Sequence, residues 1–237
     1  MIKETAGFRE QPDFERFLAL PAGEEERGKY PLETVLFGGY EVLSAMLPFV
    51  VVTLLWGNRQ KKRGQPLNGG IRCMALVLAL YAVGMYYFTG AGTVYDLFTH
   101  GAEIRSEQIN LLPFSRTIDG TAYGLNILLF LPFGLLSPWF CDRMASWKKV
   151  LEGGFSLSLL IEVSQLLNNR STDVDDLILN TLGALVGWGL YRVLRRYLPR
   201  LARPLPLPLL WMSFLIPFAG RFLLFDEIAL ARWLYGF

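Results

Sequence analysis

The sequence predicts an all-α membrane protein, a polytopic bundle of five to six transmembrane helices joined by short loops. Of its 237 residues, 52% are hydrophobic and only 19% are charged. The mean hydropathy of +0.33 is too high for an ordinary soluble domain. Apolar runs long enough to cross a hydrocarbon core of about 30 Å recur along the chain, with charged loops between them. One membrane bundle is therefore favoured over several separate domains.

The chain divides into three regions. Residues 1–34 form an acidic tail in which prolines interrupt any long helix. Its phenylalanines predict a short helix on the membrane surface, and a mobile solvated tail is the alternative. Residues 35–200 form the membrane bundle. Residues 201–237 begin with a proline-rich linker and contain a weak sixth segment at 209–225, which is short and carries Arg221.

Five stronger spans are predicted at residues 35–56, 71–90, 123–140, 150–168 and 176–194. Pro132 lies inside the third and should kink it. The loops after the first, third and fifth spans are rich in Lys and Arg, whereas the loop at 91–122 is not. Cytoplasmic loops carry such a positive excess, so the pattern predicts an N-terminus outside the cell. Within that outer loop, the apolar segment Asn110–Phe114 is too short to span and is predicted to be interfacial or re-entrant.

Polar and charged residues interrupt the apolar sequence between Ser158 and Gly187. Ionisable groups inside a membrane are expensive, so they are functional candidates. In the predicted topology they lie near the outer ends of three spans and converge on an outward-facing polar cleft. Glu162, Asp173 and Asp176 are the candidate catalytic carboxylates. The candidate binding residues are Asn126, Glu162, Gln165, Arg170, Asp173, Asp175, Asp176 and Asn180.

Structural roles compete with these functional ones. Arg170 is the obvious countercharge for Glu162 or Asp173 in a buried network. Asp175 and Asp176 near the start of the fifth span also suit helix capping, which explains one aspartate but not three in four positions beside a buried glutamate. Gly183 and Gly187 have the GxxxG spacing that lets two membrane helices approach closely.

Two kinds of ligand fit the same residues. A divalent cation could be held by Glu162 and the three aspartates, although no known all-oxygen motif is matched and no metal is assigned. A hydroxylated or phosphorylated headgroup could be bound instead, with Arg170 as the anion contact. The single histidine and the spacing of Cys73 and Cys141 exclude a structural zinc site. No other cofactor and no nucleic-acid partner is predicted.

Several motifs, in this order and spacing, resemble the VanZ-like family between about residues 105 and 197. They are Asn110-Leu-Leu-Pro-Phe114, Asn126-Ile-Leu-Leu-Phe-Leu-Pro-Phe-Gly134, Ile161-Glu162-Val-Ser-Gln165, Arg170-Ser-Thr-Asp-Val-Asp-Asp176 and Asn180-Thr-Leu-Gly183. The resemblance implies a multi-pass protein of the bacterial cell membrane. That family is named for a member that lowers susceptibility to the lipoglycopeptide teicoplanin.

Three functions are then expected to compete. The first is binding, through the outward cleft, of a membrane lipid, a lipid-linked envelope precursor or a lipoglycopeptide. The second is an intramembrane hydrolase or transferase that acts on a lipid headgroup, with Glu162 or an aspartate as general base. The third is a small transporter with Glu162 as proton site, against which stands the lack of repeated halves.

Overall fold

A computed structural model describes residues 31–100, 109–115, 120–168, 172–198 and 204–235. The predicted surface helix of the N-terminal tail lies outside these residues. The chain separates into two compact units, Glu41–Phe225 and a smaller one formed by Met1–Tyr40 with Asp226–Phe237. The larger unit contains the whole segment with family-like motifs, so it is the one that positions the candidate site.

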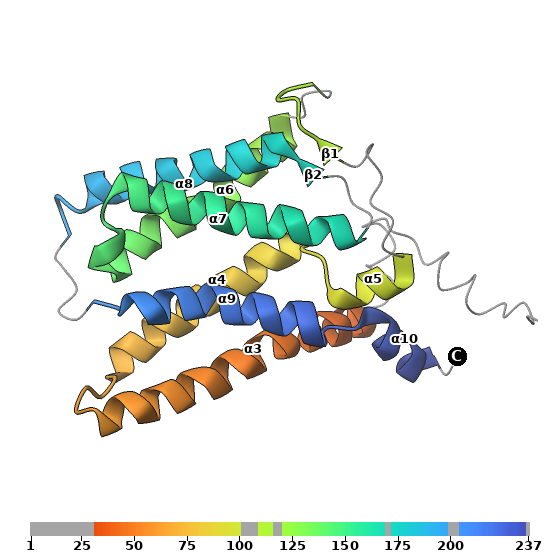
Figure 1. The fold of residues 1–237 in the computed structure, drawn as a ribbon, viewed down its shortest axis with the longest axis horizontal. Coiled ribbons are helices and arrows are strands. Elements are labelled where there is room, and N and C mark those ends of the chain that lie inside the picture. Colours follow the sequence, from red (N-terminus) through yellow and green to blue (C-terminus); the bar gives the residue numbers. More distant parts are fainter. Residues whose placement is uncertain (1–30, 101–108, 116–119, 169–171, 199–203, 236–237) are drawn as a thin grey trace, which may run out of the picture. The chain divides into compact units, whose positions relative to one another are not determined.

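Helices dominate the described residues, and the predicted all-α membrane bundle is confirmed (Figure 1). The long helices are α3 (Pro31–Lys62), α4 (Gly69–Thr89), α6 (Gly120–Phe140), α7 (Trp147–Gln165), α8 (Val174–Leu194) and α9 (Leu207–Leu224). Five of them, α3, α4, α6, α8 and α9, are long and apolar enough to cross a membrane.

Two helices differ from the expected ranking of spans. The weak sixth segment is α9, an 18-residue helix that is among the five apolar ones. By contrast, α7 occupies the predicted fourth span but is not among them. Its charged residues are the reason: Lys148, Lys149 and Glu152 lie in its first two turns and Glu162 near its end.

The remaining elements are short. They are α5 (Val94–His100), the 3-10 turns η2 (Asp142–Met144) and η3 (Leu166–Asn168), α10 (Glu227–Tyr235), and the strands β1 (Ile109–Asn110) and β2 (Thr172–Asp173). The two strands pair in parallel, with Ile109 opposite Thr172. The outer loop predicted at 91–122 therefore contains a helix and a strand. In the smaller unit, the backbone N–H of Asp226 donates to the Tyr40 hydroxyl over 3.4 Å.

Glycines set the closest helix contact of the larger unit, between α6 and α8. A Cβ atom added to Gly183 would overlap the backbone carbonyl of Ile127, and one added to Gly187 would overlap that of Leu131. On the facing helix, a Cβ on Gly134 would overlap the carbonyl of Ala184. The GxxxG prediction of close helix approach is confirmed, and α8 is held in a fixed register along α6.

Helix α6 is continuous through Pro132 and Pro138, and a tyrosine from α4 bonds to its backbone beside Pro132. The Tyr81 hydroxyl donates to the carbonyl of Leu129 over 2.7 Å and accepts from the N–H of Phe133 over 3.2 Å. These two groups would bond each other in a regular helix, and they flank Pro132, which has no N–H. The inserted hydroxyl satisfies both of them.

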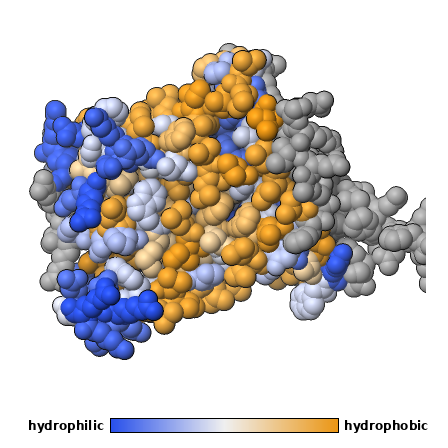
Figure 2. All heavy atoms as spheres, viewed as in Figure 1, coloured by the Kyte–Doolittle hydropathy of each residue, from blue (hydrophilic) through white to orange (hydrophobic). Residues whose placement is uncertain are grey.

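The surface of the larger unit carries an apolar belt (Figure 2). Exposed Leu54, Leu128 and Val193 are among the many large apolar side chains that contribute to it. Hydrophilic residues gather at the end where α3 and α8 finish, drawn at the left of the figure; they include Arg59, Lys61, Lys62 and Arg192. An apolar belt with a basic end is the surface expected of a membrane-spanning bundle.

One ion pair is buried inside this unit, far from the family-like motifs in sequence. Arg221 of α9 donates through Nε to a carboxylate oxygen of Glu41 in α3 over 2.6 Å, and both side chains are less than 10% exposed. An Nη atom of Arg221 also donates to the carbonyl of Ala91. Removing one partner of such a pair leaves an uncompensated buried charge, so this contact ties α9 firmly to α3.

Candidate functional site

The candidate site forms where α7 ends and α8 begins. The strand β2 connects to the start of α8, and its pairing with β1 brings the segment 109–115 beside this corner (Figure 1). Asn110 faces Asp173 across the strand pair and donates its amide N–H groups to both carboxylate oxygens, over 3.1 and 3.2 Å. The first motif of the outer loop is thereby bound to the acidic corner. We use the term acidic cluster for Glu162, Asp173, Asp175 and Asp176.

Asp173 is the residue that caps α8. Its carboxylate accepts the backbone N–H of Asp175 over 3.0 Å, which satisfies one of the free amides at the helix start. Its own N–H donates to Oε2 of Glu162 over 3.2 Å. Thr172 completes the link by donating its hydroxyl to the Glu162 backbone carbonyl over 3.0 Å. The last turns of α7 and the start of α8 are thus joined through Glu162 and Asp173.

Asp175 binds the outer loop and α6 together. One carboxylate oxygen accepts the N–H of Phe114 over 2.8 Å, and the other accepts the hydroxyl of Tyr123 over 2.6 Å. The carboxylate is only 2% exposed, so these two charge-assisted bonds compensate for its loss of water. Phe114 has a φ of 56°, a left-handed conformation that is uncommon outside glycine. The bond to Asp175 helps to hold the loop in this conformation.

Asn126 meets Asp176 across the α6–α8 contact. The Asn126 amide donates to a carboxylate oxygen of Asp176 over 2.5 Å. Asn126 is next in sequence to Ile127, which Gly183 meets at close range, so the same packing that requires glycine brings the two polar side chains together. Hydrogen bonds therefore join Glu162, Asp173 and Asp175, and Asp176, the next residue along α8, pairs with Asn126.

Two predicted site residues have other partners. Asn180 is 2% exposed and donates its amide to the hydroxyl of Ser158 on α7 over 3.0 Å. Gln165 donates its amide to the carbonyl of Thr89 at the end of α4 over 2.7 Å. In each, the side-chain oxygen is buried and has no hydrogen-bond partner among the described residues. A buried acceptor without a hydrogen bond costs free energy. Each of these two oxygens can therefore accept a hydrogen bond from a donor outside the described residues.

Glu162 also has a carboxylate oxygen, Oε1, that accepts no hydrogen bond from the described residues. Its side chain is 3% exposed, and within the described ranges the only hydrogen bond to its carboxylate reaches Oε2. Arg170, predicted to pair with Glu162 or Asp173, lies outside the described residues, so that ion pair stays a prediction. The outward-facing cleft also stays a prediction.

Sequence reasoning missed three residues that hold the site. Asn110 was noted only as part of an apolar motif, although it is the residue that meets Asp173. Tyr123 is three residues before Asn126 and so shares its face of α6, and this spacing could have identified it as a site residue. Ser158 is the partner of Asn180, and nothing in its local sequence distinguishes it from an ordinary helix serine.

The loop beside the acidic cluster is strongly apolar and exposed. Leu111 is 73% exposed, Leu112 is 71% exposed and Phe114 is 52% exposed. Leu112 donates its N–H to the Asn110 side-chain oxygen over 3.2 Å, and the Ser115 hydroxyl donates to the same oxygen over 3.0 Å. Asn110 therefore shapes the loop with one end of its amide and binds Asp173 with the other.

A metal site receives no direct support from the described part of the chain. There, no three acidic, histidine or cysteine side chains are grouped so that they could hold a metal ion. The physical reason lies in the contacts above, because the carboxylates point to different donors of the loop and of α6 instead of toward one point. The divalent cation stays a prediction.

Comparison with known families identifies the family of this chain. The family described as VanZ/LLP1 matches residues 75–195, about half of the chain. The match runs from within α4 to the end of α8 and so includes the acidic cluster, the outer loop and both faces of the α6–α8 contact. The comparisons with curated proteins and with solved structures returned no match.

Proposed function

Because this membrane protein belongs to the VanZ/LLP1 family, we propose that it acts at the bacterial cell membrane by binding a lipid-linked or amphiphilic molecule of the cell surface. A membrane lipid, a lipid-linked envelope precursor and a lipoglycopeptide are ligands of this chemistry. By engaging such a molecule, the protein would lower susceptibility to lipoglycopeptide antibiotics such as teicoplanin.

The observation that carries this proposal is the pairing of an exposed apolar loop with a polar network. Leu111 and Leu112 are more than two thirds exposed, and Asn110 and Phe114 of the same loop bond directly to Asp173 and Asp175. An amphiphile needs apolar contact for its chain and hydrogen-bonding groups for its head. This corner offers both within one loop.

The hydrogen-bonding groups suited to a polar head are the acceptors that the protein leaves unused. Gln165 and Asn180 each present a buried side-chain oxygen, and Glu162 presents Oε1. Hydroxyl or amide donors of a headgroup would satisfy them. In the proposal, Arg170 supplies the contact to an anionic group. Asn126, Asp173, Asp175 and Asp176 hold the surrounding elements in place.

The charge distribution supports an extracytoplasmic position for this corner. Basic residues lie at the opposite ends of the helices, where α3 and α8 finish. Such residues favour the cytoplasmic side of a membrane. With that end inside the cell, the acidic cluster and the apolar loop face the envelope, where surface amphiphiles are found.

The central test replaces Glu162 by Gln and Asp176 by Asn in a bacterial host that lacks its own copy. We expect both variants to lose protection against teicoplanin while their amounts in the membrane stay normal. Glu152→Gln is the matched control, since Glu152 lies on the same helix, is exposed and pairs only with Lys149 among the described residues. It should keep full protection. Loss of Glu162 and Asp176 variants from the membrane would support a purely structural network.

A second test separates ligand binding from the integrity of the network. Replacing Leu111 and Leu112 by Ser removes exposed apolar surface and touches none of the side chains that bond to the aspartates. We expect this double variant to fold normally and to lose protection. Full protection by the variant would contradict a role of the loop in binding an amphiphile.

A reaction on the same ligand is the second candidate function. It is favoured by the buried carboxyl of Glu162, since a carboxylate held away from water beside a bound ligand can serve as general base. Lipids and cell-wall precursors would be profiled in cells with the unchanged protein, with Glu162→Gln and without the gene. A species that changes only with the unchanged protein supports catalysis, and identical profiles count against it.

A further inference from the structure

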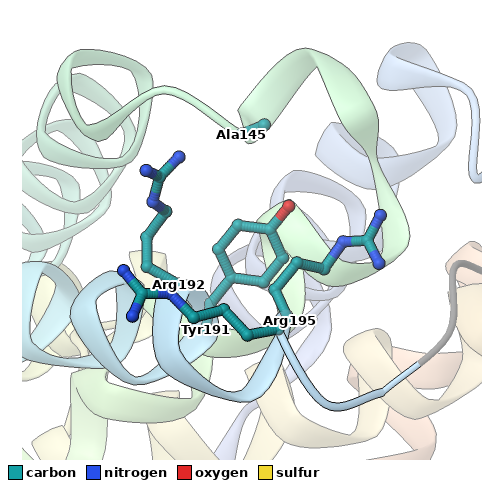
Figure 3. Close-up of a pocket in the computed structure, with 5 residues that line it drawn as sticks. Ala145, Tyr191, Arg192 and Arg195 are labelled. Atoms are coloured by element: carbon teal, nitrogen blue, oxygen red, sulfur yellow. The ribbon is translucent and has the colours of Figure 1, made fainter.

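A second candidate site lies at the basic end of the bundle, where no family-like motif was noted. It is a pocket of about 400 Å³ lined by Ala145, Tyr191, Arg192, Arg195 and Arg196, called here the arginine pocket. This volume is within the range of about 300–1,000 Å³ that is usual for small-molecule sites. Figure 3 shows the ring of Tyr191 among the arginine side chains, below the loop that carries Ala145.

The walls of the arginine pocket are fixed by contacts outside it. The indole N–H of Trp188 donates to the carbonyl of Ala145 over 2.9 Å, which holds the loop after α6 against α8. The ring of Trp139 meets that of Tyr191 edge-on, with centroids 5.9 Å apart. Arg192 lies over the Trp188 ring, 5.6 Å from its centroid. These contacts hold the loop at Ala145, the Tyr191 ring and Arg192 in place around the pocket.

The polar groups in the pocket suit an anion. Three of its five lining residues are arginines, and no acidic residue is among them. Within the described ranges no ion pair to a carboxylate involves Arg192, Arg195 or Arg196. One donor of Arg195 is used by the carbonyl of Leu198 over 3.3 Å, as expected at a helix C-terminus. The buried Tyr191 ring adds a hydroxyl that makes no hydrogen bond within the described part of the chain and points between the arginines.

The position of the pocket along α8 identifies the kind of anion. Arg195 and Arg196 follow Asp176 by about 19 residues, or roughly 29 Å of helix, close to the thickness of a hydrocarbon core. Two exposed aromatic residues are close in sequence to the pocket residues: Tyr197, 79% exposed, follows Arg196, and Trp147, 47% exposed, is two residues after Ala145. Aromatic and basic residues at such a depth mark the headgroup level of a membrane. The anion most concentrated there is the phosphate of a phospholipid.

We propose that the arginine pocket binds the phosphate of an anionic phospholipid headgroup. The guanidinium groups of Arg192 and Arg196 contact the phosphate oxygens, because planar guanidinium groups pair well with them. The Tyr191 hydroxyl donates a further hydrogen bond. This proposal is independent of the function proposed for the acidic cluster, since the two sites lie at opposite ends of α8.

The test measures lipid binding to the purified full-length protein in detergent by native mass spectrometry. Phosphatidylglycerol and phosphatidylcholine with the same acyl chains are added separately. We expect phosphatidylglycerol adducts in excess over phosphatidylcholine adducts, and the double variant R192Q/R196Q should bind phosphatidylglycerol at least about tenfold more weakly, since each arginine near anionic lipid contributes severalfold. The matched control R59Q/R63Q removes two arginines from the end of α3 and should bind as the unchanged protein does.

Three outcomes would overturn the proposal: equal binding of the two lipids, an equal loss in both double variants, or displacement of phosphatidylglycerol by millimolar inorganic phosphate. The second would assign the effect to general surface charge, and the third would make a soluble phosphate the ligand. If the double variant cannot be purified in folded form, R196Q replaces it, because Arg196 is exposed and lies beyond the end of α8. R196Q should weaken phosphatidylglycerol binding severalfold, and unchanged binding would contradict the proposal.

Discussion

Asp173, Asp175 and Asp176 show how neighbouring carboxylates take different roles. From the sequence, capping is an alternative role for one of Asp175 and Asp176, and the residue that caps α8 is Asp173. The difference arises because α8 begins at Val174, about two residues earlier than the apolar pattern indicates. The two following aspartates are thereby turned toward α6 and the outer loop, where they bind Asn126, Tyr123 and Phe114.

Among the candidate site residues, the sequence was informative where residue types are unusual for a membrane helix. Glu162 and Asn180 could be singled out because polar groups inside apolar runs are expensive. Their partners could not be predicted with the same success. Ser158 and Asn110 are ordinary in their local sequence, and only the packing of α7 on α8 and the pairing of β1 with β2 give them a role.

The Tyr81 hydroxyl bonds the backbone of α6 on both sides of Pro132. Tyr81→Phe would remove both hydrogen bonds that the hydroxyl makes beside Pro132, and the free energy of unfolding should fall by about 1–3 kcal/mol. The measurement is the unfolding midpoint in detergent. Tyr87→Phe is the control on the same helix, since Tyr87 is 45% exposed and should tolerate the change. Equal midpoints for both variants would contradict the bridging role.

At the scale of elements, the apolar runs predicted most helices to within a few residues. Helix α4 begins where the Asn68 side chain accepts the N–H of Ile71 over 2.8 Å and ends at Gly90, which has a φ of 61°. Both signals are local, so they can be read from sequence. The strands β1 and β2 could not be predicted, because two-residue strands have no periodicity and their pairing joins segments more than sixty residues apart.

The contact between α6 and α8 allows a sharp test of packing. Gly187→Ala places a methyl group onto the backbone of α6 at Leu131, so the two helices must separate. Overpacking of this kind typically costs about 1–3 kcal/mol of unfolding free energy. Gly189→Ala, two residues along the same helix, has open space around the new Cβ and should be neutral or slightly stabilising. Thermal unfolding of the purified variants measures both.

The consequence for function follows from the same contact. Separation of α6 from α8 would also pull Asn126 away from Asp176, because that hydrogen bond joins the same two helices. We therefore expect Gly187→Ala to reduce protection against teicoplanin as well as stability, whereas Gly189→Ala should affect neither. Loss of stability with full protection would show that the network is not required for the activity.

At the scale of the membrane bundle, the two ends of α8 carry opposite chemistry. One end holds the acidic cluster and the exposed apolar loop, and the other holds the arginine pocket. Composition alone predicted a membrane bundle, because an apolar belt needs only many apolar residues in long runs. It could not predict the arginine pocket, which depends on how Trp188 and Trp139 fix the surrounding elements.

Orientation in the membrane decides which end meets the envelope, and cysteine labelling measures it. In a background with Cys73→Ser and Cys141→Ala, a cysteine at Leu112 would report on the exposed loop, and one at Arg63 would report on the basic end of α3. The positive-inside rule leads us to expect that an impermeant maleimide labels the Leu112→Cys variant in intact cells. The Arg63→Cys variant should be labelled only after permeabilisation.

The reverse labelling pattern would place the acidic cluster in the cytoplasm, where intact teicoplanin and other surface amphiphiles do not reach it. The proposed surface ligand would then be wrong, while the phospholipid proposal would stand, because anionic phospholipid is present in the membrane itself and the arginine pocket lies at headgroup depth. The labelling experiment therefore separates the two proposals: the one for the acidic cluster depends on which side of the membrane it faces, and the one for the arginine pocket depends only on its depth.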